Sequence, residues 1–96
     1  MKRAQVIKLI SEQQQALVRF GVERLSLFGS FAREEAHPDS DIDVLVDFEE
    51  KATFDRYMDL KFFLEDLLGQ RVDLVTRNAL RTSVRSKIEQ EALRIV

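Results

Sequence analysis

Two aspartates near the middle of the chain have the spacing of metal ligands. Asp41 and Asp43 stand at the start of a mostly apolar stretch that reaches Phe48 and predicts a β-strand. Because successive side chains of a strand point to opposite faces, both carboxylates should lie on the same face. Neighbouring carboxylates repel each other unless a cation lies between them, and hard oxygen ligands of this kind suit Mg²⁺.

Upstream of the aspartates, a turn has the composition of a phosphate site. The apolar run Leu25–Phe28 predicts the end of a strand, and Gly29 and Ser30 then begin a short helical piece. Backbone N–H groups at a helix N-terminus are free to bind phosphate, and glycine, which lacks a Cβ, lets a phosphate approach closely. Ser30 adds a hydroxyl. These two residues could also form an ordinary turn, but beside two metal-binding acids they favour a bound nucleotide.

Together these residues resemble a known signature. The order Gly29-Ser30, Arg33, Ser40-Asp41-Ile42-Asp43 resembles that of the DNA polymerase β-like nucleotidyltransferase superfamily, and the short chain looks like its minimal nucleotidyltransferase (MNT) branch. The resemblance implies a mixed sheet of the polymerase β-like type. It also implies an Mg²⁺-dependent enzyme that transfers a nucleoside monophosphate, with AMP from ATP as the expected case, to an acceptor hydroxyl and releases pyrophosphate.

The resemblance assigns metal-binding and catalytic roles to three acids. In this superfamily two Asp residues of one strand and one of a later strand bind metal, and Asp73 is the natural third beside Asp41 and Asp43. On a strand that we expect to be central, an acid is costly unless it is paired, hydrated or metal-bound. Two ions about 3.5–4 Å apart would hold the attacking and leaving oxygens, with Asp73 on the second ion and accepting the proton. The alternative is that Asp73 pairs with Arg71 or Arg77.

Two further residues of the candidate nucleotide site keep a structural alternative. Arg33 could reach the triphosphate bidentately. It could equally pair with a nearby acid, namely Glu34, Glu35 or Asp41. Ser40 could orient Asp41 or cap the start of the strand.

The partner is also implied by the resemblance. After the core fold, little chain remains to bind a base or an acceptor, so we expect a partner to bring the acceptor. MNT domains are commonly antitoxins of HEPN-type toxins, and they can neutralise the toxin by adding AMP to one of its tyrosines. Two alternatives are an antitoxin that acts by binding alone and a small-molecule transferase of the aminoglycoside-modifying kind. The absence of a second domain for a small substrate counts against the latter.

Composition excludes several other classes of function. A formal net charge of −2 gives no general attraction to nucleic acid, so we expect no general nucleic-acid binding. The chain has no cysteine and one histidine, which excludes disulfides, thiolate zinc sites and His-rich metal sites. No long apolar run follows the basic N-terminus, so we expect no signal peptide, no membrane association and a cytoplasmic protein.

Apolar periodicity predicts seven elements in the order helix, strand, helix, strand, helix, strand, helix. They cover residues 2–19, 22–28, 29–36, 41–48, 54–68, 71–76 and a last helix from about residue 82. We therefore expect an α/β (α+β) fold in a single domain, residues 1–96, with about three strands in a small mixed sheet packed with helices. Apolar residues on the first and last helices could also support a homo-oligomer.

Caps and apolar faces complete the expected architecture. Thr53 and Gly69 predict the start and end of helix 54–68, Ser30 is a candidate cap of the helix after Phe28, and Thr82 or Ser83 is a candidate cap of the last helix. The residues expected to face inward are Ile42, Val44, Val46 and Phe48 on strand 41–48; Phe54, Met58, Phe62, Leu64, Leu67 and Leu68 on helix 54–68; Val6, Leu9, Ile10, Leu17 and Val18 on the first helix; and Val84, Ile88, Ala92 and Ile95 at the C-terminus.

Overall fold

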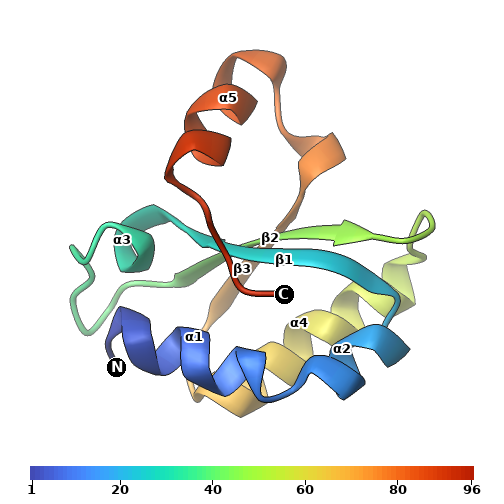
Figure 1. Ribbon diagram of the computed structural model, residues 1–96, viewed down its shortest axis with the longest axis horizontal. Helices are drawn as coiled ribbons and strands as arrows, with labels where there is room; N and C mark the ends of the chain where they lie inside the picture. The colour runs from blue at the N-terminus through green and yellow to red at the C-terminus, as the bar shows by residue number, and fades with distance from the viewer.

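Four strands form one mixed sheet at the centre of the molecule (Figure 1). The computed structural model describes residues 1–96. β1 (Val22–Phe28) and β2 (Ile42–Phe48) are antiparallel, β3 (Val72–Thr76) lies parallel to β2, and β4 (Leu93–Arg94) pairs antiparallel with β1. The order across the sheet is therefore β3-β2-β1-β4. This confirms the expected mixed sheet and adds a fourth, two-residue strand that we did not predict.

The helices cover the sheet unequally. α1 (Arg3–Ser11), α2 (Gln14–Arg19) and α4 (Phe54–Leu68) form a layer on one side of it (Figure 1). α5 (Thr82–Glu91) rises on the other side, after the 3-10 turn η1 (Arg77–Ala79). None of these helices combines the length and apolar character needed to cross a membrane.

The core lies between the sheet and the three-helix layer. Ile42, Val44 and Val46 of β2 are fully buried, as expected from their shared face. They pack in one cluster with Leu60 and Leu64 of α4. Full burial of such a side chain contributes about 1.5–3 kcal/mol to folding, so this alternation on β2 fixes which face of the sheet carries the acids.

The ends of α4 confirm the expected caps. Thr53 Oγ1 accepts a hydrogen bond from the backbone N–H of Arg56 at 3.2 Å. At the other end Gly69 adopts the left-handed conformation with φ 66°, and its N–H donates to the Glu65 carbonyl at 2.8 Å. A side-chain oxygen at the start and a glycine after the end satisfy backbone groups that the helix itself leaves unpaired.

The buried face of α4 differs from the expected one. Phe54 and Phe62 are 75% and 54% exposed, whereas Leu60 and Leu64 are fully buried. A step of two residues turns a helix by about 200°, so Phe62 lies nearly opposite these leucines. The expected stripe mixed the two faces, and the part that ran through Phe54 and Phe62 was wrong.

This correction predicts unequal effects of two truncations on α4. Leu64→Ala should lower the free energy of unfolding by about 2–5 kcal/mol because it opens a cavity in the core. Phe62→Ala should change it by no more than about 0.5 kcal/mol because that ring is more than half exposed. Urea unfolding followed by far-UV circular dichroism measures both; equal losses would contradict the observed face.

The expected helix over residues 2–19 is two helices. α1 ends at Ser11 and α2 begins at Gln14, because Gln13 between them has φ −106° and ψ 26°, outside the helical range. Because of this break, the buried face of α2 does not continue the apolar periodicity of α1. Val18, expected to point inward, is therefore 61% exposed.

The expected boundary and cap of the helix after β1 are also wrong. α3 (Gly29–Ala32) is one short turn and stops before residue 36. Glu34 has φ 59°, a left-handed conformation that ends the turn. Ser30 lies inside α3 and does not cap it.

The C-terminal helix is less buried than expected. No residue of α5 is buried, and Val84 is 43% exposed. Its N-cap is Arg81, so neither Thr82 nor Ser83 caps it. Ile95 lies beyond the helix, next to β4, where it joins the edge of the core.

β3 is an edge strand rather than the central strand we expected, and Asp73 on it is exposed. Two side chains of α4 cover the free edge of β3. Glu65 Oε2 accepts from the Val72 N–H at 3.0 Å, and the Tyr57 hydroxyl donates to the Leu74 carbonyl. Burial, with a smaller effect from the charge of Asp73, raises the pKa of Tyr57. These contacts satisfy edge groups on either side of Asp73 that could otherwise recruit another strand.

Candidate active site

Three adjacent strands bring Gly29, Asp43 and Asp73 together. Asp43 is the register partner of Phe28 on β1 and of Asp73 on β3. Gly29 directly follows Phe28, and neighbouring strands lie about 4.8 Å apart. The candidate site therefore lies where β1 ends and β2 and β3 begin, as the sequence pattern predicted for these residues.

Gly29 is required by close contact as well as by conformation. Its φ is +73°, and a Cβ built on it would lie 2.0 Å from Asp43 Oδ2. No side chain can occupy that space unless Asp43 moves. The absence of a side chain at Gly29 thus leaves room for the carboxylate on the next strand.

The carboxylates of the site repel one another. The pKa of Asp43 is raised to about 6, first by burial and then by the negative charges of Asp73 and Asp41. A hydrogen bond with Asp73 contributes, and Arg33 partly opposes the change. A cation bound here would relieve the repulsion.

Asp41 is held in an ion pair. Its Oδ1 pairs with Arg71 Nε at 3.2 Å, with both side chains largely exposed. No group of three acids or histidines in the structure forms a ready-made set of metal ligands. An exposed pair of this kind contributes only about 0–1 kcal/mol, so Asp41 can leave Arg71 at little cost. The three carboxylates suit Mg²⁺ in ligand chemistry and charge, with Asp43 and Asp73 adjacent on neighbouring strands and Asp41 two residues before Asp43.

Arg33 makes ion pairs with two glutamates. Its Nε lies 3.0 Å from Glu35 Oε2, and its Nη1 lies 3.1 Å from Glu91 Oε2. The hydrogen bonds to these glutamates raise the pKa of Arg33, and the one to Glu35 has the larger effect. Of the expected acid partners, Glu35 is therefore the observed one, while Glu34 pairs with Arg3 instead.

Glu91 is a residue of the site that we did not predict. Its Oε1 accepts a hydrogen bond from the backbone N–H of Gly29 at 3.0 Å and lies 3.2 Å from Arg33 Nη1. Glu91 is separated from Gly29 by 62 residues and lies at the end of an exposed helix. No local pattern marks it, because only the pairing of β4 with β1 brings it here.

The two serines predicted near the site, Ser30 and Ser40, lie in different structural elements: Ser30 is on α3, and Ser40 is in the turn before β2. Ser30 is half-buried on α3, beside Gly29. Ser40 Oγ accepts from the His37 N–H at 3.0 Å, and the Ser40 N–H donates to the His37 carbonyl at 2.8 Å. Ser40 therefore closes the turn before β2, and its hydroxyl holds this loop rather than the carboxylate of Asp41.

The N-terminal helix contacts the turn that follows β1. Arg3 Nη1 donates to the Ala32 carbonyl at 2.9 Å, and Arg3 Nη2 pairs with Glu34 at 3.1 Å.

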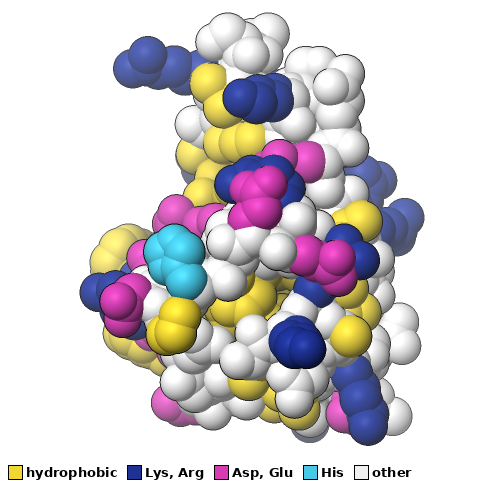
Figure 2. All heavy atoms as spheres, turned by 90° about the vertical axis from the view of Figure 1, so that its left-hand side faces the viewer, with side chains coloured by type: hydrophobic (Ala, Val, Ile, Leu, Met, Phe, Trp, Pro, Cys, Tyr) yellow, Lys and Arg dark blue, Asp and Glu magenta, His cyan; other side chains and the backbone are white.

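On the face that carries His37, acidic side chains lie next to Lys and Arg side chains (Figure 2). Charges of both signs therefore surround the turn between β1 and β2.

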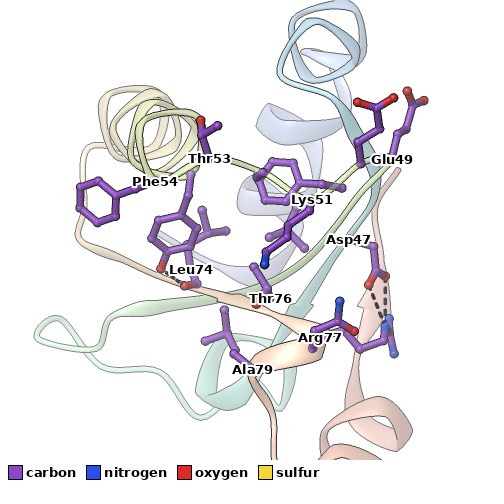
Figure 3. Close-up of a pocket in the computed structure, with 16 residues that line it drawn as sticks. Asp47, Glu49, Lys51, Thr53, Phe54, Leu74, Thr76, Arg77 and Ala79 are labelled. Carbon is purple, nitrogen blue, oxygen red and sulfur yellow. Dashed lines mark hydrogen bonds and ion pairs between the residues drawn. The ribbon is translucent and has the colours of Figure 1, made fainter.

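A groove of about 960 Å³ lies at the opposite end of β2 and β3. Asp47 points to Arg77 on its wall, with Arg77 Nε 3.0 Å from Asp47 Oδ1 (Figure 3). This ion pair gives Asp47 a structural role. Neither Asp43 nor Asp73 lines the groove, so it is separate from the candidate site.

Comparison with known proteins agrees with this geometry. The nucleotidyltransferase domain family matches residues 6–95, which is nearly the whole chain. The chain belongs to this nucleotidyltransferase family. The mixed sheet is of the type that the resemblance implied.

Relatives of this nucleotidyltransferase include enzymes that act on proteins. The chain is 40% identical over 85 residues to the protein adenylyltransferase MntA of Thermococcus cleftensis, covering 88% of this chain and 86% of MntA. A solved structure assigned to the minimal nucleotidyltransferases is 39% identical, with TM-score 0.86 and coverage of 97% and 95% of the two chains. The complex of a tri-AMPylated Shewanella oneidensis HEPN toxin with its MNT antitoxin shares the fold, with TM-score 0.66, 20% identity and coverage of 94% and 71%.

Proposed function

We propose that this nucleotidyltransferase transfers AMP from ATP to a hydroxyl of a partner protein, and that it acts as the antitoxin of a HEPN-type toxin. The observation that carries the proposal is that Asp43 and Asp73 lie side by side on adjacent strands, with Gly29 directly after the end of the third strand, β1. The similarity to a protein adenylyltransferase over most of both chains supports AMP as the transferred group and a protein as the acceptor.

The proposed reaction forms one bond and breaks another. The acceptor oxygen bonds to the α-phosphorus of ATP, the bond from that phosphorus to the oxygen shared with the β-phosphate breaks, and pyrophosphate leaves. Asp73 is the group that we propose accepts the hydroxyl proton, because it is exposed on the edge strand, where a partner's side chain can reach it. Asp43 lies beside it on the next strand.

The same residues would hold the metal and the phosphates. Asp41, Asp43 and Asp73 would bind Mg²⁺, which, when bound, offsets the negative charge of the triphosphate and of the leaving pyrophosphate. The N–H of Gly29, the hydroxyl of Ser30 and the guanidinium of Arg33 would hold the phosphate oxygens. A guanidinium and a backbone N–H are both strong donors to phosphate.

The test uses each of the four nucleoside triphosphates labelled on the α-phosphate, together with Mg²⁺ and the protein encoded next to this chain. Label should appear on the partner with ATP. Asp41→Asn should abolish it, while Asp39→Asn, the same charge change on an exposed turn nearby, should retain it. Asp41 is a better position to substitute than a buried acid, because its only ion pair is exposed and its loss should disturb the fold little. Absence of label with all four nucleotides, despite a stable complex, would contradict the proposal and favour an antitoxin that acts by binding alone.

A further inference from the structure

The carboxylate of Glu91 lies where the proposed function places a phosphate of ATP. Glu91 Oε1 accepts from the Gly29 N–H at 3.0 Å, and both carboxylate oxygens lie within 3.2 Å of Arg33 Nη1. Its side chain is only 24% exposed. A backbone N–H and a guanidinium together form a binding site for an anion, and the anion in this structure is part of the chain itself.

Glu91 and a phosphate cannot use these donors at the same time. Gly29 has one backbone N–H, and Glu91 already accepts its hydrogen bond. A triphosphate beside Glu91 would also add negative charge close to the carboxylates of Asp43 and Asp73, which lie on adjacent strands. Binding of ATP in this cradle therefore requires the carboxylate of Glu91 to leave.

The helix that carries Glu91 packs only lightly against the rest of the fold. α5 has no buried residue, and only Ala92 separates its last residue, Glu91, from β4. Its other side-chain ties are an exposed ion pair between Glu89 and Arg77 and a bond from Arg85 to the Leu80 carbonyl. Exposed pairs of this kind contribute about 0–1 kcal/mol, so displacement of α5 costs little while β4 stays on the sheet.

We propose that Glu91 closes the phosphate cradle as an internal substitute for the substrate, and that ATP binds only after displacing it. The inference rests on the proposed function, since it takes the Gly29–Arg33 cradle as the site of the triphosphate. It makes nucleotide binding and the docking of α5 mutually exclusive. The apparent affinity for ATP is then lowered by the fraction of molecules in which Glu91 occupies the cradle.

The test compares binding of ATP and of inorganic tripolyphosphate to the wild type, Glu91→Gln, Glu91→Ala and the control Glu89→Gln. Isothermal titration calorimetry with Mg²⁺ gives the dissociation constants. Removing the competing carboxylate should tighten both ligands about tenfold. Glu89→Gln makes the same charge change on the same helix and breaks a tie of α5 without emptying the cradle, so it should stay within about twofold of wild type.

Hydrogen exchange gives a second readout that does not depend on activity. Adding Mg²⁺ and ATP to the wild type should increase exchange of the backbone amides of α5, because the helix loses its contact with the cradle. In Glu91→Ala these amides should exchange faster even without nucleotide, and ATP should change them little.

The outcomes separate the inference from the proposed function. Tighter binding by both Glu91 variants, with faster exchange in α5, supports the internal substitute. Equal or weaker binding by those variants, with transfer of AMP by the wild type intact, overturns it and makes Glu91 a residue that positions Arg33. Absence of ATP binding and of transfer in every variant overturns the proposed function and this inference together.

Discussion

Asp43→Asn is expected to remove AMP transfer. In the absence of metal, the same substitution is expected to raise the free energy of unfolding. The loss should reach about 10²–10⁴-fold, because the acid lies between the glycine turn and Asp73, where it would bind the metal. The gain in stability follows because the variant no longer carries a charge that burial, and then the neighbouring carboxylates, make unfavourable in the folded chain. A pKa raised from 3.8 to about 6 corresponds to about 3 kcal/mol, and solvent screening of this partly exposed group reduces the gain to about 1–2 kcal/mol.

The pH dependence has a definite sign. Below about pH 4 Asp43 is protonated in both the folded and the unfolded chain and contributes no difference. Between about pH 4 and 6 the unfolded chain releases the proton while the folded chain retains it, so the wild type loses stability as pH rises. The advantage of Asp43→Asn should therefore grow over this range and then stay constant.

Urea unfolding in the presence of a chelator, at pH 4 and at pH 7.5, measures this difference. Mg²⁺ should then raise the melting temperature of the wild type and leave that of Asp43→Asn nearly unchanged, because the variant lacks a ligand. Asp39→Asn is the control for the loss of one exposed negative charge. A variant that is less stable than wild type at pH 7.5 would show that the charge of Asp43 is not unfavourable in the folded chain.

Gly29→Ala should be as damaging to transfer as the loss of an acid. The new Cβ would lie 2.0 Å from Asp43 Oδ2, so the carboxylate or the turn must move by more than 1 Å. Displacements of about 1 Å in an active site cost about 10²-fold in rate. The positive φ adds a conformational cost, so the free energy of unfolding should fall by about 1–3 kcal/mol.

Gly69→Ala is the matched control for this substitution. Gly69 has φ +66°, close to the +73° of Gly29, but a Cβ on it meets no atom within 4 Å. It should therefore carry the conformational cost of about 1 kcal/mol and keep full transfer. Label transfer and urea unfolding of both variants separate the two effects; a Gly29→Ala protein as active as Gly69→Ala would show that the close contact with Asp43 is unimportant.

Much of the fold, and the positions of Gly29 and Asp43 in the candidate site, could be predicted from local sequence patterns. Strand alternation identified β1 and β2 and the face that bears Asp43, because burial of one face fixes the register of the other. Thr53 and Gly69 marked α4 because their chemistry completes helix ends. The glycine before the two acids could be recognised because both the turn and the metal site restrict which residues can stand there.

Features that depend on contacts far apart in sequence could not be predicted in the same way. The edge position of β3 left Asp73 exposed, and only the strand order shows this. The buried side of α4 was misjudged because Phe62 is as apolar as Leu64, and tertiary packing decides between them. Glu91 reaches Gly29 only because β4 pairs with β1. The two residues of β4 are too few to leave a periodic signal in the sequence.

The most direct measurement of the central claim is the intact mass of the partner protein after co-expression with this chain. The partner would be purified in complex with the wild type, with Asp41→Asn and with Asp39→Asn, and its mass determined by mass spectrometry. The account predicts AMP on the partner with the wild type and Asp39→Asn, and an unmodified partner in an equally stable complex with Asp41→Asn. An unmodified partner that is bound and neutralised equally by all three would contradict it.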